Sequence, residues 1–203
     1  MKSCIIIGAG LTGLIAAREL TNHGWEVTVL DKGRGVGGRM ATRRIANTRA
    51  DHGAQYFSVR TPEFRKMVEQ LEEADILKAW DLSEAGVEHL RYIGTRGMSS
   101  IPKYLAQDLH IELQERATLI EGDESGCRVT TEAGHTFRAH ALILTIPAPQ
   151  ALTLLRDSTI ALPESERLAL EAITYQPCLA VIALLNQPSR IPAPGMQILE
   201  KGA

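Results

Sequence analysis

The sequence predicts an α/β fold with a parallel sheet, to which an α+β part is added. The first part of the chain has the pattern strand, glycine turn, helix, strand, and the rest alternates helical stretches with short β-rich ones. The 203 residues are 44% hydrophobic and 23% charged, which is ordinary for a globular protein with a buried core. This composition excludes a mainly disordered chain.

The N-terminal segment gives the clearest elements. Cys4 to Ile7 is a short apolar run before Gly8, as expected for a buried parallel strand. The apolar positions of Thr12 to Asn22 predict a helix, which Gly24 ends. Glu26 to Leu30 is rich in β-branched residues and predicts a second strand. Together they form a βαβ unit.

The next segment, Lys32 to Ala50, is rich in Gly and Arg and predicts a loop. A helix is expected over 62–73, because Thr61 and Pro62 suit its N-cap and its first position. The elements expected after it are a strand over 88–93 and a helix over 99–107.

From Ile111 onward the sequence is β-rich. The turn residues Glu132, Ala133 and Gly134 lie between two alternating runs and predict a hairpin. The expected strands are 111–113, 117–121, 127–131, 136–139, 141–146 and 178–185. Helices are expected over 149–155 and 164–173, and no clear element over 187–203.

Several classes of protein are disfavoured. The three cysteines are too few and too far apart for a disulfide scaffold, and the six histidines lack metal-ligand spacing, so no metal is expected. The longest apolar run, Cys178 to Leu185, is too short to cross a bilayer, so no membrane association is expected. The apolar stretch after Lys2 contains motif-spaced glycines and no polar cleavage region, and we interpret it as part of the fold of a cytoplasmic protein.

A glycine motif lies between the first strand and the first helix. Gly8, Gly10 and Gly13 have the spacing that permits a tight turn, close approach of a pyrophosphate, and close packing of helix on strand. The helix N-terminus adds free N–H groups and the positive end of its dipole. Asp31 ends the second strand, where a carboxylate accepts hydrogen bonds from ribose hydroxyls. The combination predicts a Rossmann-like dinucleotide site, and a glycine-rich turn without a ligand is the alternative.

The basic residues of the chain are concentrated after Asp31. Residues 1–60 hold nine Lys/Arg and four Asp/Glu, and the segment 32–49 holds six of these bases and no acid. A second glycine-rich loop here, Lys32 to Met40, favours a buried, extended FAD over a nicotinamide cofactor, because its phosphates need further donors. A solvated basic loop is the alternative. Nucleic acid is disfavoured, because no aromatic residues are interleaved with the bases.

Five segments together resemble the renalase-like branch of the FAD-dependent amine oxidase superfamily, and they cover the chain nearly from end to end. They are VGGRMATRR (36–44), DHGAQYF (51–57), RGMSSIPKYLA (96–106), ALILTIPAPQAL (141–152) and LEAITYQ (170–176). The resemblance implies a Rossmann-like FAD-binding domain of the GR2 type with a β-hairpin or meander insertion, plus the incomplete start of an α+β substrate domain. It implies four domain segments. Residues 1–58 and 96–150 are the two parts of the FAD-binding domain, 59–95 are a substrate-domain insertion, and 151–203 are a partial substrate domain.

The resemblance also implies site residues and an activity. With the glycine motif and Asp31, the expected FAD contacts are Gly8, Gly10, Thr12, Gly13, Asp31, Lys32, Gly38, Arg39, Met40, Gln55, Tyr56 and Ala117. The loop with GGR is expected at the phosphates, the GAQY segment at the flavin, and the backbone around Ala117 at the adenine. The implied reaction is oxidation of a small-molecule amine or dihydronicotinamide-type substrate by hydride transfer to the flavin, with O2 as acceptor.

The catalytic residues stay open. Gln55 and Tyr56 are candidates for stacking on or hydrogen bonding to the flavin, with packing roles as the alternative. His52 lies beside them in the sequence. A positioned loop histidine is a simpler interpretation of this residue than a general base. Flavin chemistry needs no protein nucleophile, because the cofactor accepts the hydride.

The sequence departs from the family at its end. The family's chains continue with a Gly-Asp segment that returns to the FAD, and nothing after Ala141 has this form. A truncated, non-catalytic dinucleotide-binding remnant is therefore an alternative, and a nicotinamide-dependent dehydrogenase is a third. Neither the substrate nor the oligomeric state follows from the sequence.

Overall fold

The computed structural model describes residues 1–83, 89–191 and 195. The chain divides into two compact units, each formed by two separate segments of sequence. The first unit comprises Met1–Gly38 and Leu105–Leu179, and the second comprises Arg39–Tyr104 and Ala180–Ala203. The four domain segments expected from the sequence stay a prediction.

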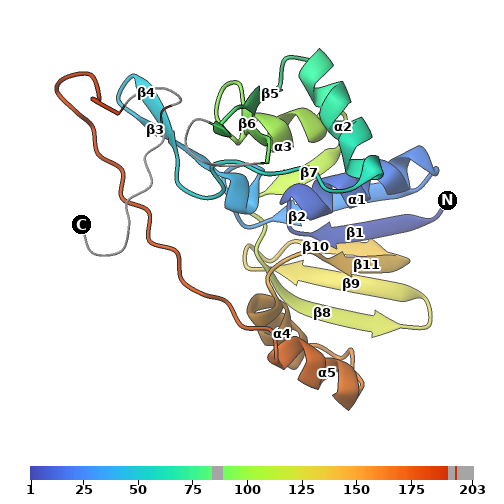
Figure 1. The fold of residues 1–203 in the computed structure, drawn as a ribbon. Helices are drawn as coiled ribbons and strands as arrows, with labels where there is room; N and C mark the ends of the chain where they lie inside the picture. Colours follow the sequence, from blue (N-terminus) through green and yellow to red (C-terminus); the bar gives the residue numbers. More distant parts are fainter. Residues whose placement is uncertain (84–88, 192–194, 196–203) are drawn as a thin grey trace. The chain divides into compact units, whose positions relative to one another are not determined.

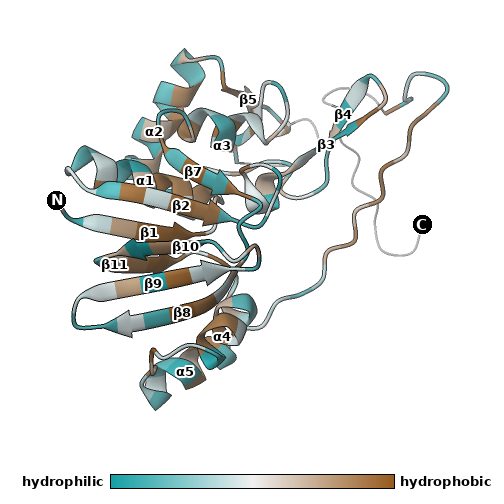
Figure 2. Cartoon of the chain, turned by 180° about the vertical axis from the view of Figure 1, so that it is seen from behind, coloured by the Kyte–Doolittle hydropathy of each residue, from teal (hydrophilic) through white to brown (hydrophobic). Residues whose placement is uncertain are grey.

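The first unit is built on a parallel sheet (Figure 1). Its order is β11 (Ala141–Leu144), β1 (Ser3–Ile7), β2 (Glu26–Asp31) and β7 (His110–Leu113), with every neighbouring pair parallel. Strands β1 and β11 are drawn mainly in hydrophobic colours in Figure 2, as expected for a sheet covered on both faces. The predicted α/β class with a Rossmann-like parallel core is confirmed.

Two layers cover this sheet. Helix α1 (Leu11–Asn22) packs against β1 and β2. On the other face, Ile5 and Ile7 join a core cluster with residues of an antiparallel meander and of α4. Successive strand residues point to opposite faces, so the fully buried Ile6 faces away from this cluster. The elements of this layer are β8 (Ala117–Asp123), β9 (Gly126–Thr131), β10 (Thr136–Ala139), α4 (Ala148–Arg156) and, after it, α5 (Glu164–Glu171).

The second unit is smaller and contains two antiparallel strand pairs. Its elements are β3 (Thr42–Ile45), β4 (Thr48–Asp51), α2 (Pro62–Glu73), β5 (Leu77–Trp80), β6 (Arg91–Gly94) and α3 (Ser100–Leu105). Helix α2 begins as predicted, because the Thr61 hydroxyl accepts a hydrogen bond from Phe64 N–H at 3.3 Å. Phe57 stacks on Tyr92, with 5.7 Å between the ring centroids, and helps to form the core of this unit.

The structure corrects the secondary structure expected from the sequence at four places. The segment 32–50 is not a simple loop, because Gly38–Met40 forms a 3₁₀ turn and the polar residues of β3 and β4 pair as a hairpin. Strand β5 was missed because Leu77 is its only fully buried residue. The expected strand 178–185 is absent, since no described strand pairs with it and its Leu179 and Val181 side chains are over 90% exposed. The strand expected over 88–93 begins at Arg91, and position 88 lies outside the described residues.

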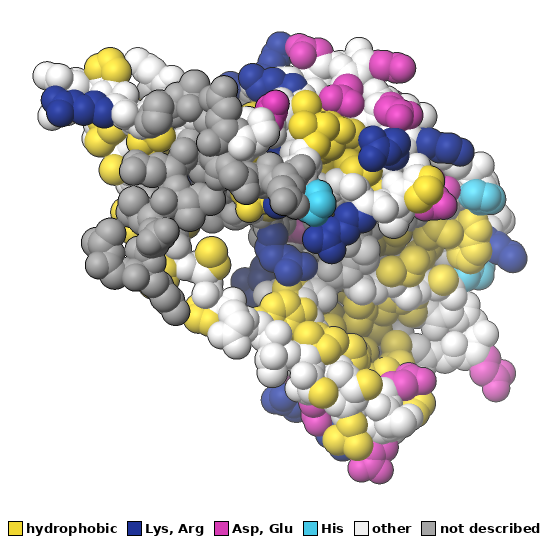
Figure 3. Space-filling view, viewed as in Figure 1, with side chains coloured by type: hydrophobic (Ala, Val, Ile, Leu, Met, Phe, Trp, Pro, Cys, Tyr) yellow, Lys and Arg dark blue, Asp and Glu magenta, His cyan; other side chains and the backbone are white. Residues whose placement is uncertain are grey.

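Side chains at the surface include several large hydrophobic ones. Figure 3 shows hydrophobic side chains gathered around α4 and α5, where Leu168, Ile173 and Tyr175 are about half exposed. Within the described part of the chain, none of the helices has the length and apolar character needed to cross a membrane.

Candidate cofactor site

The glycine turn between β1 and α1 has the tight geometry that its sequence predicts. Gly8 has a φ of +112°, in the region that favours glycine. A Cβ on Gly13 would lie 1.9 Å from the carbonyl oxygen of Gly8, so only glycine lets the helix approach the strand this closely. Thr145, which follows β11, fixes the turn from the other side: its Oγ1 lies 2.9 Å from the Gly8 oxygen and 3.1 Å from the Ile7 oxygen.

Gly10 has a different environment from Gly8 and Gly13. It is the N-cap residue of α1 in extended backbone, and a Cβ there would meet no protein atom within 4 Å. No side chain caps the helix, and no acidic residue lies in its first turn. The N-terminus of α1 therefore presents unpaired N–H groups and a positive dipole end to open space, which is the arrangement that binds a phosphate.

Asp31, at the end of β2, connects the turn to the next loop. Its Oδ2 accepts a hydrogen bond from Ala9 N–H at 2.6 Å, and its Oδ1 accepts one from Gly33 N–H at 2.7 Å. Each carboxylate oxygen can accept a second bond. The loop after Gly33 then returns to the turn, where Gly37 N–H donates to the Ala9 carbonyl at 2.8 Å.

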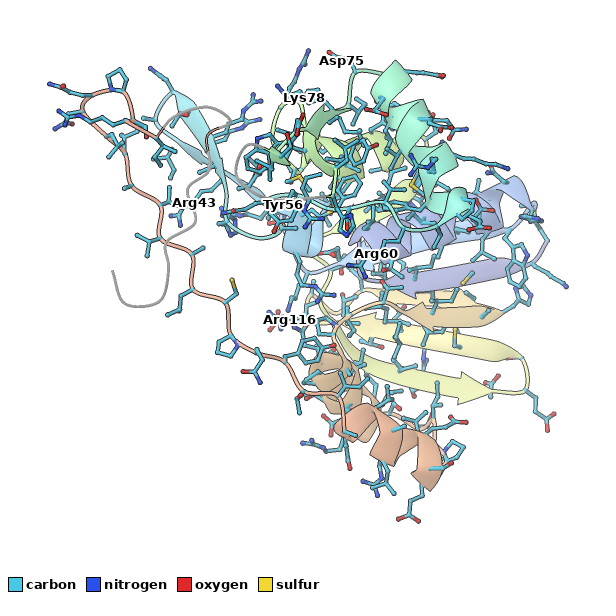
Figure 4. The ribbon with its side chains drawn as sticks, viewed as in Figure 1. Arg43, Tyr56, Arg60, Asp75, Lys78 and Arg116 are labelled. Carbon is cyan, nitrogen blue, oxygen red and sulfur yellow. The ribbon has the colours of Figure 1, made fainter. Side chains whose placement is uncertain are left out.

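A cavity of about 590 Å³ opens at the carboxyl ends of β1 and β2. Four of the predicted cofactor residues line it: Gly8, Asp31, Lys32 and Ala117. Other lining residues come from the segment that leads into β8, including Arg116 (Figure 4), and from α4. The volume is in the range of cofactor and ligand sites, which is about 300–1,000 Å³. In open α/β sheets, ligands bind at this carboxyl edge of the strands.

Glu115 also lines this cavity, and no sequence motif indicated it. Its Oε1 lies 2.7 Å from His135 Nδ1, in the turn between β9 and β10. The pKa of the Glu115 carboxyl is lowered, first by the neighbouring Thr131 hydroxyl and then by His135. Glu115 N–H donates to the Asp31 carbonyl at 2.9 Å, so this loop is tied to the end of β2.

In the second unit, the two most distinctive motifs pack directly on each other. Ala54 N–H donates to the Arg39 carbonyl at 2.8 Å, and a Cβ on Gly53 would lie 2.0 Å from that same oxygen. Arg39 itself is exposed, and its guanidinium has no hydrogen-bond or ion-pair partner among the residues described. Met40 is buried, whereas His52 is exposed.

Tyr56 belongs to an aromatic and cationic cluster within this unit (Figure 4). Its ring meets Trp80 edge to face at 6.2 Å, and the Arg91 guanidinium lies 5.2 Å from the centroid of the Tyr56 ring. Tyr56 is 41% exposed, which is unusual for a large aromatic side chain held by two neighbours. Trp80 lines a second cavity together with Gln55.

Asp51 joins three of the motif segments, and sequence reasoning missed this role. Its Oδ1 accepts hydrogen bonds from the Thr42 hydroxyl and from Met98 N–H, the latter at 3.0 Å. Ser99 N–H in turn donates to Thr42 Oγ1 at 3.0 Å. A Cβ on Gly97 would lie 2.8 Å from Thr42 Oγ1, which explains the glycine before α3.

The predicted cofactor residues thus form two groups. Those of the first unit lie at the glycine turn or on the cavity wall: Gly8, Gly10, Thr12, Gly13, Asp31, Lys32, Gly38 and Ala117. Those of the second unit lie in the two packed motifs: Arg39, Met40, Gln55 and Tyr56. Their role in cofactor binding stays a prediction. In the described ranges, no cluster of three or more His, Cys, Asp or Glu side chains is placed to hold a metal ion.

Comparison with known proteins supports the same interpretation. Residues 6–71 match the NAD(P)-binding Rossmann-like domain, and residues 72–198 match the flavin-containing amine oxidoreductases. Mouse renalase is 30% identical over 193 residues, which cover 86% of this chain and 56% of renalase. The L-amino-acid oxidase of Bothrops pauloensis is 39% identical over 69 residues, covering 34% of this chain and 13% of that enzyme.

A solved structure shows the same fold. A protein of Exiguobacterium sp. 255-15 assigned as a protoporphyrinogen oxidase superposes with a TM-score of 0.65 and 16% identity, over 85% of this chain and 64% of that one. The chain thus spans a little over half of renalase and about two thirds of this structure. From these matches, the chain belongs to the flavin-containing amine oxidoreductase family, as a renalase-like member.

Proposed function

We propose that the chain binds FAD and acts as a renalase- or amine-oxidase-like oxidoreductase. The observation that carries the proposal is the cavity at the carboxyl ends of β1 and β2, which Gly8, Asp31, Lys32 and Ala117 all line. Family membership supports a flavin, and the glycine turn beside this cavity supports a flavin that carries an adenine dinucleotide.

The residues present fit this cofactor. The uncapped N-terminus of α1 and the open space beside Gly10 leave room for a pyrophosphate. Asp31 lines the cavity, and each of its carboxylate oxygens can accept a second hydrogen bond, as a ribose hydroxyl requires. In the second unit, Arg39 is exposed and Met40 is buried, and Arg39 is a proposed donor for phosphate.

The chemistry follows from the cofactor class. A bound FAD would supply the hydride acceptor for a reduced amine or dihydronicotinamide-type substrate, with O2 as the final acceptor of the two electrons and H2O2 as its product. The chain's own residues bind and orient the cofactor and the substrate. Gln55 and Tyr56 are the proposed contacts near the flavin, and the Trp80 and Arg91 side chains hold the Tyr56 ring in place.

Reconstitution tests the proposal. The purified chain is mixed with FAD and desalted, and the retained flavin is measured by its visible absorbance and by quenching of its fluorescence. Retention of about one FAD per chain is expected. Arg39→Gln should weaken FAD binding, and Arg60→Gln, an exposed arginine of the same unit, is the matched control (Figure 4). A chain that retains no flavin refutes the proposal.

Turnover is tested separately, because the chain spans only 56% of renalase. Under anaerobic conditions, amines and dihydronicotinamides are added to the FAD-loaded chain, and bleaching of the flavin absorbance is followed. Bleaching by one class identifies the substrate. Stable FAD binding without bleaching by either class favours the second candidate, a dinucleotide-binding module that lacks catalysis.

A further inference from the structure

The second unit contains a cavity of its own, distinct from the one at the glycine turn. It has a volume of about 690 Å³ and lies between the β3–β4 hairpin, strand β6 and the turn that follows β6. Polar and basic side chains line most of it, among them Thr48, Arg49, Thr95 and Arg96, and the Trp80 ring adds an aromatic surface. The described residues that line it all belong to one compact unit.

Among the described residues that line this cavity, positive charge exceeds negative charge, with Arg49 and Arg96 against Asp51. Arg49 Nη1 donates to the Arg96 carbonyl at 3.3 Å, which brings the two arginines to the same rim. Neither guanidinium forms an ion pair with any described residue. Asp51 is the acidic residue of the described lining, and its Oδ1 already accepts hydrogen bonds from Thr42 and from Met98 N–H.

The hairpin adds a second, independent sign of an anion site. Arg44 of β3 lies directly opposite Arg49 of β4, so the two side chains are on the same face of the hairpin. Like charges placed directly opposite one another destabilise a strand pair. A bound anion relieves this repulsion, and it also accounts for part of the basic segment 32–49 that the proposed cofactor contacts leave unexplained.

The aromatic side of the cavity is held in place. Trp80 meets Tyr56 edge to face, and the Arg91 guanidinium packs over the Tyr56 ring. The Arg91 Nε is buried without a hydrogen-bond partner, so this arginine is committed to the cluster. The Trp80 ring therefore offers a fixed, flat surface beside the two exposed guanidinium groups.

We propose that this cavity binds an anionic aromatic molecule, with its acid group between Arg49 and Arg96 and its ring against Trp80. This inference deepens the proposed function and rests on it for one point, which is that the bound anion is a substrate. The reason is that Gln55, a proposed flavin contact, lines the same cavity. The substrate class is then an aromatic or heteroaromatic compound with a carboxylate or phosphate group. Planar guanidinium groups are well suited to either acid.

The test uses para-nitrobenzoate and its uncharged analogue para-nitrobenzamide as probes. The chain has two tryptophans, so the Trp25→Phe variant leaves Trp80 as the sole indole. The nitroaromatic probe should quench Trp80 fluorescence, which locates the binding site, and calorimetry gives the Kd of each probe. We expect the carboxylate to bind at least tenfold more tightly than the amide, because a hydrogen bond to a charged group contributes about 1.5–3 kcal/mol.

Two variants and a control decide which residues bind the acid. Arg49→Gln and Arg96→Gln should each weaken para-nitrobenzoate binding roughly tenfold and leave para-nitrobenzamide binding unchanged. Arg43→Gln is the matched control, because Arg43 lies opposite Ala50 in the same hairpin and does not line the cavity (Figure 4). Equal affinity for the two probes, or equal loss in all three variants, overturns the proposal.

The same titration separates this inference from the proposed function. Failure of the chain to retain FAD refutes cofactor binding, but probe binding that depends on Arg49 and Arg96 still supports the anion site. In the FAD-loaded chain the affinity for para-nitrobenzoate should be unchanged or higher. Loss of probe binding on saturation with FAD assigns the cavity to the cofactor and overturns its assignment to a substrate.

Discussion

Substitution of Gly13 by Ala separates the structural role of the glycine motif from its binding role. The added Cβ would lie 1.9 Å from the Gly8 carbonyl oxygen and 2.8 Å from Thr145 Oγ1. An ordinary contact needs about 3.5 Å, so helix and strand must separate by roughly 1.5 Å. Because the closest atom belongs to the backbone of the turn that follows β1, no side-chain rotation relieves the overlap.

The free energy of this change follows from two opposing terms. Overpacking costs about 1–3 kcal/mol, and a rigid backbone neighbour places Gly13→Ala at the upper end. The higher helix propensity of Ala returns at most about 1 kcal/mol. We expect a net loss of about 2 kcal/mol in the free energy of unfolding, which corresponds to a fall in Tm of roughly 4–8 °C for a chain of this size.

Gly10→Ala is the matched comparison. Its Cβ would meet no protein atom within 4 Å, and its φ of −78° suits any residue. The variant should keep the Tm of the natural chain within about 1–2 °C. FAD binding should weaken at least tenfold, because the methyl group occupies the space in which the pyrophosphate approaches the backbone.

The assays are thermal unfolding by circular dichroism and FAD titration by fluorescence quenching. A Gly13→Ala variant as stable as the natural chain would refute the close packing of α1 on β1. A Gly10→Ala variant with unchanged FAD affinity would refute the phosphate assignment at the helix N-terminus. A Gly10→Ala variant with a strongly lowered Tm would show that Gly10 is needed for folding.

Three further substitutions test other contacts. Asp51→Ala removes the carboxylate that joins the β3–β4 hairpin to the turn before α3; we expect a loss of about 2–3 kcal/mol in chemical denaturation, and an unchanged midpoint would contradict the role of this network. Thr61→Ala removes the hydrogen bond to Phe64 N–H, and should lower the stability of α2 by about 1 kcal/mol, measured in the same way, whereas Thr61→Ser should retain most of it. The pKa of Glu115 is lowered in the folded chain, first by the Thr131 hydroxyl and then by His135, so these contacts stabilise the fold above the usual carboxyl pKa of 4.5 and less as the pH falls below it. Glu115→Gln should therefore lower Tm at neutral pH and reduce the loss of Tm on acidification, and parallel Tm profiles of the two chains between neutral and acidic pH would contradict this linkage.

Much of the first unit was predictable because its signals are local. The apolar run of Cys4 to Ile7, the glycine spacing and the β-branched run before Asp31 each depend on neighbouring residues in sequence. Strand β10 has the predicted bounds, Thr136–Ala139, because Gly134 marks its turn with a φ of +84°. In each of these elements, the hydrophobic periodicity and the turn residues indicate the same local structure.

Other elements were not predictable because their stability comes from distant partners. The hairpin of β3 and β4 is polar and basic, and Asp51 holds it through residues almost fifty positions later in the chain. The apolar stretch 178–185 has strand-like composition, but a strand needs a hydrogen-bonding neighbour, and the described part of the chain offers none.

The sequence by itself therefore determined the fold class, the glycine turn and the family resemblance, since each is expressed in short-range spacing. Only the tertiary structure showed that Asp31, Lys32 and Ala117 line one cavity, because these residues come from separate parts of the chain. It alone also placed Arg49 and Arg96 at one rim beside Trp80. Local patterns specify helices, strands and turns, whereas a binding site depends on which of their ends the packing brings together.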